Sequence, residues 1–409
     1  MSSKKLDRSA SVWCLALLAL ACSAGGPEAA APEVASALGS PPAAEHSFAP
    51  YLTGGGGELL LTWIEPLGEG AHRVRFARWT EAGWGAPATV TEGADLFANW
   101  ADTPGVVRGG DDALYAHWLA ETGSEKYAYS ILLARSVDHG ATWEPLGPLP
   151  DDDTPTEHGF VSWVPEADGA RAFWLDGRQW VEGGPMSLRT ARVGSAGVSG
   201  AARLDARVCD CCPTAAAMGE GGPLVVYRDR SEDEIRDIYR MSWAGGGWGE
   251  PEPVAVDGWR IEGCPVNGPR VAARDGREAV AWFTAAGDEA AVRMVFAGPG
   301  ATPSTERSTP LRVDDGRPLG RVDLELGEGG AWVIWLEALA ERRERAEVRL
   351  RWVSDAGELS ESRAVAETGS ARASGFPHLA RLGERLVLAW VESTTGSSPR
   401  VRVTDLGTR

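Results

Sequence analysis

The sequence lacks long helical patterns, a basic excess and a nucleotide-binding glycine motif. Helix-type periodicity is nearly absent from its 409 residues, whereas Gly (51) and Trp (18) are abundant, a mix typical of short strands joined by many turns. The net charge of −18 excludes the broad basic surface that nucleic acids select. An acidic ligand would therefore need a local basic pocket. No G-x-G-x-x-G follows a strand and opens a helix, which argues against a nucleotide cofactor.

Long apolar runs are also missing, and the run at residues 12–21 is too short to span a bilayer as a mature helix. Three basic residues precede it and the sequence ALAC (19–22) ends it, an order typical of an export signal. This ending resembles a lipobox, which implies a lipoprotein signal peptide over residues 1–22 with Cys22 as the lipidated residue. Ala19 stands where the lipobox has Leu, so ordinary signal cleavage is the alternative.

The predicted export signal sets expectations for the domain boundaries and the location of the protein. Residues 23–45 are rich in Ala, Pro, Gly and Glu and are predicted to be a flexible tether, followed by a single domain at 46–409. We expect the protein in the cell envelope, attached through an N-terminal lipid to the outer membrane or the cell surface.

An apolar strand that ends in an aromatic residue recurs along the chain. Its seven occurrences are spaced 53 to 56 residues apart: they end at Trp63, Trp118, Trp174, Tyr227, Trp282, Trp335 and Trp390. An acidic residue follows two places later in five of the units: Glu65, Asp176, Asp229, Glu337 and Glu392. Seven nearly equal steps indicate a repeat architecture.

Each repeat has the same internal order of four short segments with period-two alternation, separated by Gly- and Asp-rich turns. Four antiparallel strands repeated radially make a β-propeller. We therefore predict an all-β fold with seven four-stranded blades, with six as the alternative. The first strands are predicted at 46–49, 97–104, 157–164, 209–216, 264–272, 319–326 and 373–380. The last unit ends before a fourth strand, which the segment upstream of His46 is predicted to supply, and such a closed ring is expected to be a monomer.

The segment Ser136–Trp143, SVDHGATW, lies between the third and fourth strands of the second unit. It resembles the Asp box, S-x-D-x-G-x-x-W, of the sialidase (BNR-repeat) propellers. In that family the box is a structural turn on the face away from the ligand. The resemblance implies a propeller and an exo-glycosidase acting on acidic, sialic-acid-type glycans, with three arginines on the substrate carboxylate and a Tyr nucleophile. The chain departs from the family in having seven repeats and no Arg-Ile-Pro motif before the box.

In a propeller, the starts of the first strands and the loops after the second strands open on one face around the central channel, where ligands bind. These segments carry the candidate acid/base residues Asp237 and Asp176, and Glu234. The candidate nucleophile, Tyr239, lies in the third strand that follows the loop of Glu234. Candidate ligand contacts are Arg178, Arg228, Arg230, Arg236, Arg321, Asp323, Glu157, His158, Asn99 and Asn267.

Each of these candidates has a structural alternative. Arginines can grip a carboxylate in bidentate geometry, but alternating charges such as those of YRDRSEDEIRD also pair with one another on surfaces. Tyr239 lies in a third strand, where packing is the common role. Glu157 and His158 could pin the channel mouth, and Asn99 and Asp102 could form turns.

Four cysteines remain in the mature domain: Cys209, Cys211, Cys212 and Cys264. An even count in an exported protein favours two disulfides, although the neighbours Cys211 and Cys212 could bridge each other only with strain. The alternative is a thiolate site for copper or zinc, the one cofactor the sequence suggests.

Three hypotheses about function follow. The chain is an acidic-glycan hydrolase, a non-catalytic propeller that binds a glycan, glycoconjugate or protein, or a metal-site protein.

Overall fold

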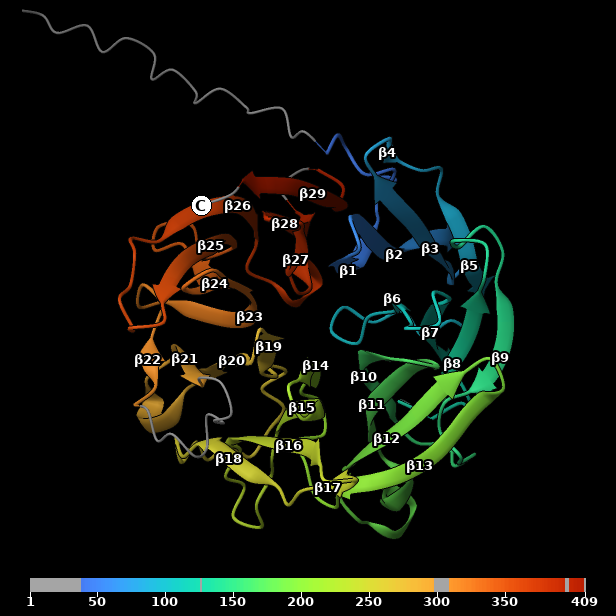
Figure 1. Ribbon diagram of the computed structural model, residues 1–409, viewed down its shortest axis with the longest axis horizontal. Coiled ribbons are helices and arrows are strands. Elements are labelled where there is room, and N and C mark those ends of the chain that lie inside the picture. The colour runs from blue at the N-terminus through green and yellow to red at the C-terminus, as the bar shows by residue number, and fades with distance from the viewer. Residues whose placement is uncertain (1–37, 126, 298–308, 394–396, 408–409) are drawn as a thin grey trace, which may run out of the picture. The chain divides into compact units, whose positions relative to one another are not determined.

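The computed structural model describes residues 38–125, 127–297, 309–393 and 397–407, so Cys22 and the predicted signal peptide lie outside the described residues. Seven antiparallel sheets are arranged in a ring around a central axis (Figure 1), which confirms the predicted seven-bladed propeller. The first strand of each sheet lies innermost and contacts the first strand of the next. β1 meets β27 and completes the ring.

The blades follow one another along the chain. Blade 1 contains β1 (Phe48–Gly55), β2 (Glu58–Gly68), β3 (Ala71–Thr80), β4 (Gly83–Trp84) and β5 (Ala88–Gly93). Blade 2 contains β6 (Gly105–Arg108), β7 (Leu114–Glu121), β8 (Tyr129–Ser136) and β9 (Glu144–Pro148). Blade 3 contains β10 (His158–Glu166), β11 (Gly169–Asp176), β12 (Ser187–Gly194) and β13 (Gly197–Asp205). Blade 4 contains β14 (Ala215–Gly219), β15 (Gly222–Arg228), β16 (Ile238–Ala244), β17 (Gly247–Trp248) and β18 (Glu252–Ala255).

The remaining blades are built in the same way. Blade 5 contains β19 (Arg270–Arg274), β20 (Arg277–Thr284), β21 (Ala291–Ala297) and β22 (Leu311–Arg312). Blade 6 contains β23 (Pro318–Gly327), β24 (Gly330–Ala338), β25 (Arg345–Ser354) and β26 (Arg363–Gly369). Blade 7 contains β27 (His378–Leu382), β28 (Arg385–Glu392) and β29 (Arg400–Gly407). Short 3₁₀ turns are η1 (Arg178–Glu182), η2 (Ala286–Asp288) and η3 (Arg372–Ser374). None of the helices in the described ranges is long and apolar enough to cross a bilayer.

The outer strand of blades 1 and 4 is interrupted. β4 and β5 both pair with β3, and β17 and β18 both pair with β16. Pro87 and Pro251 lie in the two interruptions, where a residue without a backbone N–H cannot extend the ladder. Each pair of short strands thus makes one fourth strand.

In three of the five units that carry the pair, the repeated aromatic and acidic residues form a buried hydrogen bond inside the blade. The indole N–H donates to the carboxylate two residues later in Trp63–Glu65 (2.7 Å), Trp174–Asp176 (3.0 Å) and Trp335–Glu337 (2.6 Å). The repeat thus places a satisfied polar pair next to the blade core, since a buried indole N–H requires an acceptor. In blade 5 the residue at that position is Thr284, and Trp282 donates instead to Asp257 (2.7 Å).

The predicted first strands begin too early in four blades. Pro104, Pro269 and Pro377 immediately precede β6, β19 and β27, and Pro213 lies two residues before β14. Because proline cannot donate to the ladder, the ladder begins after it. The residues assigned to strands before these prolines form loops at the channel mouth.

Of the segment before β1, the structure describes residues 38–47, which include the last part of the predicted tether; the rest of the tether lies outside the described residues. Residues 38–47 contain no strand and instead pack between blades 1 and 7, with Leu38 and Ala43 buried. Arg400 Nε donates to the Ala43 carbonyl (2.9 Å), and Val401 N donates to Ser47 Oγ (2.9 Å). Burial of two apolar side chains and these bonds hold the segment in place, so it joins the ends of the ring by side-chain contacts.

The segment Ser136–Trp143 forms the turn between β8 and β9. Asp138 accepts hydrogen bonds from Ser136 Oγ (2.7 Å) and Thr142 N (2.9 Å), and these bonds, with that of the Thr142 hydroxyl, lower the pKa of Asp138 to about 2. Trp143 packs edge-on against Phe76 of blade 1. The alternation of strand directions places this turn on the face opposite the loops that open the first strands.

Candidate functional site

Three side chains from different blades form a constriction in the central channel: Tyr51 of β1, Arg270 of β19 and His378 of β27. All three line two cavities: a narrow one of about 20 Å³, here called the upper cavity, and one of about 210 Å³, here called the lower cavity. Asp102 borders the upper cavity and Asp323 the lower one. The channel is therefore polar at the constriction, where three innermost strands converge.

Arg270 is the cation of this constriction. Its Nε lies 3.8 Å from Asp323 Oδ1, beyond hydrogen-bond distance. Burial would raise the pKa of Asp323, but Arg270, His378 and the Leu379 N–H outweigh burial and lower it. Burial lowers the pKa of His378, which favours the neutral ring. At neutral pH the constriction thus holds a guanidinium, a carboxylate and a neutral imidazole.

Several polar atoms at the constriction lack a hydrogen bond within the part of the chain that the structure describes. Within the described ranges, the guanidinium of Arg270 and the hydroxyl of Tyr51 make no hydrogen bond, and His378 Nε2 is buried without one. Buried polar groups are normally satisfied. These three groups therefore define the candidate binding site, and none of them was selected from the sequence.

A second polar cluster lies where blades 2 and 3 meet. Tyr129 donates its hydroxyl proton to Glu157 (2.6 Å), and Asp102 Oδ2 lies 3.5 Å from the same oxygen. All three side chains are less than 10 % exposed. Burial raises the pKa of Glu157 to about 7 and that of Asp102 well above its ordinary range. This is a proton-holding cluster whose first-strand member, Glu157, was among the predicted contacts.

Glu157 should leave a signature in the pH dependence of stability. Its pKa of about 7 exceeds the unfolded value of about 4.5, so the folded state binds the extra proton between these limits. Stability contributed by this group is present below about pH 4.5 and is lost as the pH rises toward 7. The steepest slope for one proton is about 1.4 kcal/mol per pH unit. Urea unfolding of wild type and Glu157→Gln across pH 4–8 should show a flatter curve for the variant, and parallel curves would contradict this assignment.

The predicted acid Asp176 is fully buried in blade 3. It accepts from Trp174, its Oδ1 accepts from Arg178 Nε (2.7 Å), and its Oδ2 lies 3.2 Å from His158 Nδ1. Burial opposes ionisation, but His158 and Arg178 outweigh it and lower the pKa of Asp176. Arg178 also binds Asp151 (2.7 Å). The structure brings Asp176, Arg178 and His158 together as one ion-pair network that pins the start of β10 to the end of β11.

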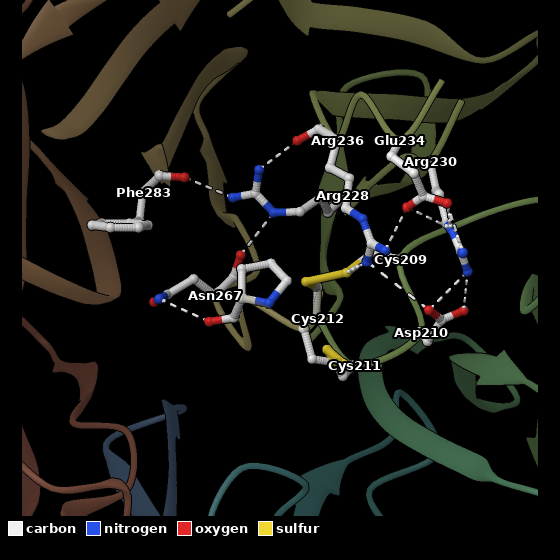
Figure 2. The surroundings of a disulfide bond; sticks show 12 residues. Cys209, Asp210, Cys211, Cys212, Arg228, Arg230, Glu234, Arg236, Asn267 and Phe283 are labelled. Atoms are coloured by element: carbon white, nitrogen blue, oxygen red, sulfur yellow. Dashed lines mark hydrogen bonds and ion pairs between the residues drawn. A yellow bond between two sulfur atoms is a disulfide. The ribbon is translucent and has the colours of Figure 1, made fainter. Parts of the chain in front are cut away.

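Arg228 is fully buried and does not line either of the two channel cavities. Its guanidinium donates to the carbonyls of Asn267 (2.9 Å), Arg236 (2.6 Å) and Phe283 (2.6 Å) (Figure 2). It also lies over the ring of Trp259. The guanidinium of this predicted anion contact is thus already hydrogen-bonded to three carbonyls from blades 4 and 5.

The other charges of the YRDRSEDEIRD loop pair with one another. Arg230 binds Glu234 (2.7 Å) and Asp210 (2.9 Å), and Arg236 binds Glu234 (2.8 Å) (Figure 2). Hydrogen bonds from the two arginines outweigh burial and lower the pKa of Glu234 to about 2. Glu234 is therefore a carboxylate held by two cations. Its backbone lies in the left-handed region, with φ of 61°. Its hydrogen bonds go to Arg230 and Arg236, and none joins it to Tyr239.

The remaining catalytic candidates lie apart from the constriction. Asp237 accepts from the backbone N–H groups of Gly258 (2.9 Å) and Trp259 (3.3 Å), which holds the loop after β18. Tyr239 lies in β16 opposite Tyr227. Burial raises the pKa values of both Asp237 and Tyr239. The structure does not gather Asp237, Tyr239, Glu234 and Asp176 into one site.

Two of the predicted contacts instead join neighbouring blades. Asn267 Oδ1 accepts from Arg321 N (2.8 Å), and in the same way Asp102 Oδ1 accepts from Phe160 N (2.8 Å). Arg321 and Phe160 have φ of 54° and 58°, and glycine precedes each because a Cβ there would overlap the acceptor side chain. Strained residues of this kind persist where surrounding contacts hold them.

The other first-strand candidates have similar structural partners. The Arg321 guanidinium donates to the carbonyls of Ala371 and Gly375 (both 3.1 Å). Asp323 Oδ2 accepts from Leu379 N (2.9 Å), and Asn99 Oδ1 accepts from Ala101 N (2.9 Å), a local turn.

The four cysteines form two disulfides, Cys209–Cys212 and Cys211–Cys264, with Cα–Cα distances of 5.7 and 6.0 Å. The second joins the loop before blade 4 to the loop before blade 5. This pairing avoids a bond between the sequence neighbours Cys211 and Cys212 and agrees with the two disulfides that the even cysteine count favoured.

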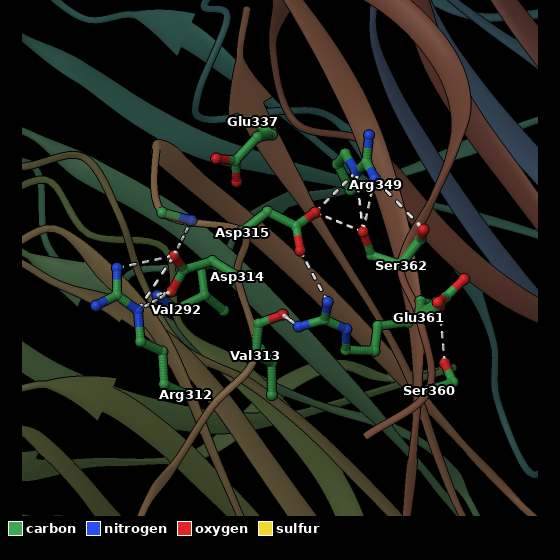
Figure 3. A network of polar contacts seen from close by, with 12 residues as sticks. Val292, Arg312, Val313, Asp314, Asp315, Glu337, Arg349, Ser360, Glu361 and Ser362 are labelled. Atoms are coloured by element: carbon green, nitrogen blue, oxygen red, sulfur yellow. Dashed lines mark hydrogen bonds and ion pairs between the residues drawn. The ribbon is translucent and has the colours of Figure 1, made fainter.

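Figure 3 shows a further charged network, between blades 5 and 6, that the sequence did not indicate. Asp314 accepts from Val292 N (2.8 Å) and pairs with Arg312 (3.1 Å), while Asp315 pairs with Arg349 (3.0 Å) and Arg351 (2.8 Å). Every charge named here has an opposite partner, so the network joins blades and offers no open ligand site.

The channel residues could have been found from one signal. Arg270 follows Pro269 directly, and placing the fifth first strand after that proline would have brought Arg270 into the set of strand starts. Tyr51 and Tyr129 give no such signal, because one lies within a first strand and the other opens a third strand.

The fold and the channel define this chain as a seven-bladed β-propeller with a polar constriction. No protein-family model and no curated protein matches the sequence. A protein of unknown function from Dyadobacter fermentans is similar in structure, with a TM-score of 0.51 and 12 % identity over 89 % of this chain and 95 % of that chain. This likeness extends over nearly the whole of both chains and supports the fold.

Structural neighbours also include arabinanase and sialidase β-propellers. An α-L-arabinanase from Penicillium chrysogenum complexed with arabinobiose has a TM-score of 0.47 and 13 % identity over 90 % of this chain and 96 % of that chain. A Trypanosoma rangeli sialidase in complex with 2,3-difluorosialic acid has a TM-score of 0.44 and 13 % identity over 74 % of this chain and 53 % of that chain.

Proposed function

We propose that this chain is an exported propeller of the cell envelope that binds the acidic end of a glycan at its channel constriction. The observation that carries the proposal is the convergence of three groups on the two channel cavities. They are the Arg270 guanidinium, whose ion pair with Asp323 is long (3.8 Å), the Tyr51 hydroxyl, and His378 Nε2, which is buried without a hydrogen bond. The signal-type N-terminus supports export, and Cys22 is the proposed lipid anchor.

A carboxylate suits this constriction better than a neutral group. Arg270 can donate two parallel hydrogen bonds to a carboxylate, which fixes its orientation. Asp323 lies too far away to take those bonds. The Tyr51 hydroxyl can donate to or accept from a sugar hydroxyl. The lower cavity of about 210 Å³ is bordered by Ser162 and by small alanine side chains, and it is of the size of a single sugar residue.

Arg270→Gln tests the proposal. Loss of a charge-assisted hydrogen bond costs about 1.5–3 kcal/mol, so we expect affinity for an acidic glycan to fall by about 10- to 100-fold. The affinity is measured by calorimetric titration with sialosides and uronic-acid glycans, alongside their neutral counterparts. Arg274→Gln is the matched control, because Arg274 lies on the same strand but is half-exposed and pairs with Asp275 and Glu384.

Either of two results would overturn the binding proposal. Wild type would bind none of the acidic glycans, or Arg270→Gln and Arg274→Gln would bind them equally well.

Hydrolysis is a second candidate function, and the Glu157–Tyr129 pair with Asp102 favours it. A carboxyl group with a pKa of about 7 can give or take a proton near neutral pH, and sialidases use a tyrosine nucleophile. The same incubations, analysed for released sugar, distinguish a hydrolase from a binding protein. Sugar release that persists in Glu157→Gln would remove this pair from the mechanism.

A further inference from the structure

The four cysteine sulfurs gather at the channel mouth into one group, here called the sulfur cluster (Cys209, Cys211, Cys212 and Cys264). The Sγ atoms of Cys209, Cys211 and Cys212 all lie within 4.8 Å of one another, and Cys264 is bonded to Cys211. Cys209 and Cys212 are buried, Cys211 is half-buried and Cys264 is exposed. The sulfur cluster therefore has a buried side and a side open to solvent. None of its cysteines belongs to the channel constriction or to the cluster of Tyr129, Glu157 and Asp102.

The loops that carry the sulfurs are held together by contacts other than the disulfides. Cys209 N donates to the Arg228 carbonyl (2.9 Å), and Arg230 binds the side chain of Asp210 (2.9 Å). On the other side, the Arg228 guanidinium holds the Asn267 carbonyl, three residues after Cys264. Breaking both S–S bonds would leave these contacts in place, so we expect the four thiols to remain near one another.

The charges around the cluster favour thiolates. Arg236 Nη1 lies 3.3 Å from Cys209 Sγ and donates a hydrogen bond to it (Figure 2). A cation at this distance stabilises a thiolate, and a hydrogen bond to a coordinating sulfur is a typical outer contact of a metal site. Asp210, the carboxylate within the cluster's loop, is taken by Arg230, which leaves sulfur as the donor.

We propose that the reduced sulfur cluster binds one soft metal cation of the Zn²⁺ or Cu⁺ type through its thiolates, and that disulfide formation closes the site. A dithiol reductant supplies two electrons and two protons to each disulfide and itself becomes a disulfide. The metal then displaces the thiol protons as the metal–sulfur bonds form. Sulfur donors at mutual distances of a few ångströms suit such cations. This site is separate from the channel constriction and does not rest on the glycan proposal.

Metal titration of the oxidised and reduced chain tests this inference. The chain is reduced with a phosphine under anaerobic conditions, and Zn²⁺ or, as a spectroscopic substitute, Co²⁺ is added. Native mass spectrometry should find one ion per reduced chain and none per oxidised chain, and Co²⁺ should show thiolate charge-transfer absorption. Circular dichroism and tryptophan fluorescence follow the fold of the reduced chain.

Two variants separate a built site from scattered thiols. Arg236→Gln removes the hydrogen bond to Cys209 and should weaken binding by about 10- to 100-fold. Arg260 lies on the neighbouring loop, is exposed and pairs with Glu262. The Arg260→Gln variant should therefore bind the metal like wild type. The inference is overturned if the folded, reduced chain binds no ion, if both variants bind equally, or if reduction alone unfolds the chain, since the frame of contacts would then fail to hold the sulfurs.

Discussion

Replacing Arg228 with methionine should lower the free energy of unfolding by about 3–5 kcal/mol, because three buried carbonyls lose their hydrogen-bond donor. The side chain is 1 % exposed and donates to the carbonyls of Asn267, Arg236 and Phe283. Methionine keeps most of the volume but donates nothing, so three acceptors between blades 4 and 5 lose their donor. Each unsatisfied buried group costs about 1–3 kcal/mol.

Denaturant unfolding of the Arg228→Met variant, followed by tryptophan fluorescence, measures this loss. Arg260→Met is the control, because an exposed arginine with one long ion pair (3.5 Å) should change stability by no more than about 0.5 kcal/mol. Equal stability of the two variants would mean that the Arg228 bonds to the three carbonyls contribute nothing net.

The second large effect concerns the bridge between Cys211 and Cys264. Removing it by Cys211→Ser with Cys264→Ser should cost about 4 kcal/mol, because the bond closes a loop with a sequence separation of 53 and its loss frees that loop in the unfolded chain. The Cys209–Cys212 bond spans a separation of only 3. By the same chain-entropy relation its removal should cost about 2 kcal/mol.

The two double-serine variants therefore serve as controls for each other. Both are unfolded in denaturant beside the wild type, under conditions that keep the remaining disulfide oxidised. A greater loss for Cys209→Ser with Cys212→Ser than for the long-range pair would show that local packing, and not chain entropy, governs the contribution of these bonds.

The residues of the YRDRSEDEIRD loop illustrate the limit of prediction from sequence. Their density of charge and their place after a second strand predicted a loop, and the structure has one between β15 and β16. Sequence spacing could not tell whether Arg228 would face a ligand or a carbonyl of the next blade. In the structure Arg228 faces those carbonyls, and Arg230 and Arg236 face Glu234. A buried cation needs acceptors, and a neighbouring blade 39 and 55 residues away supplies them.

The constriction was out of reach for a related reason. Tyr51, Arg270 and His378 belong to blades 1, 5 and 7 and lie in strands whose alternation predicts burial but not orientation toward the channel. Only the closure of the ring brings them together. The Glu157–Tyr129 pair was half visible, since Glu157 precedes a predicted strand but its partner comes from the third strand of the preceding blade.

The sequence by itself determined the architecture of this protein. The period of 53 to 56 residues, the two-residue alternation and the aromatic–acidic pairs are local patterns, and local patterns decide strands, turns and blade number because each blade repeats the same short-range contacts. The tertiary structure alone decided which polar groups are hydrogen-bonded within the protein and which remain available to a ligand. Residues that meet, such as Asp102 with Phe160, Arg228 with Phe283, and Arg270 with Tyr51, come from different blades. Only the folded ring determines the distances between them.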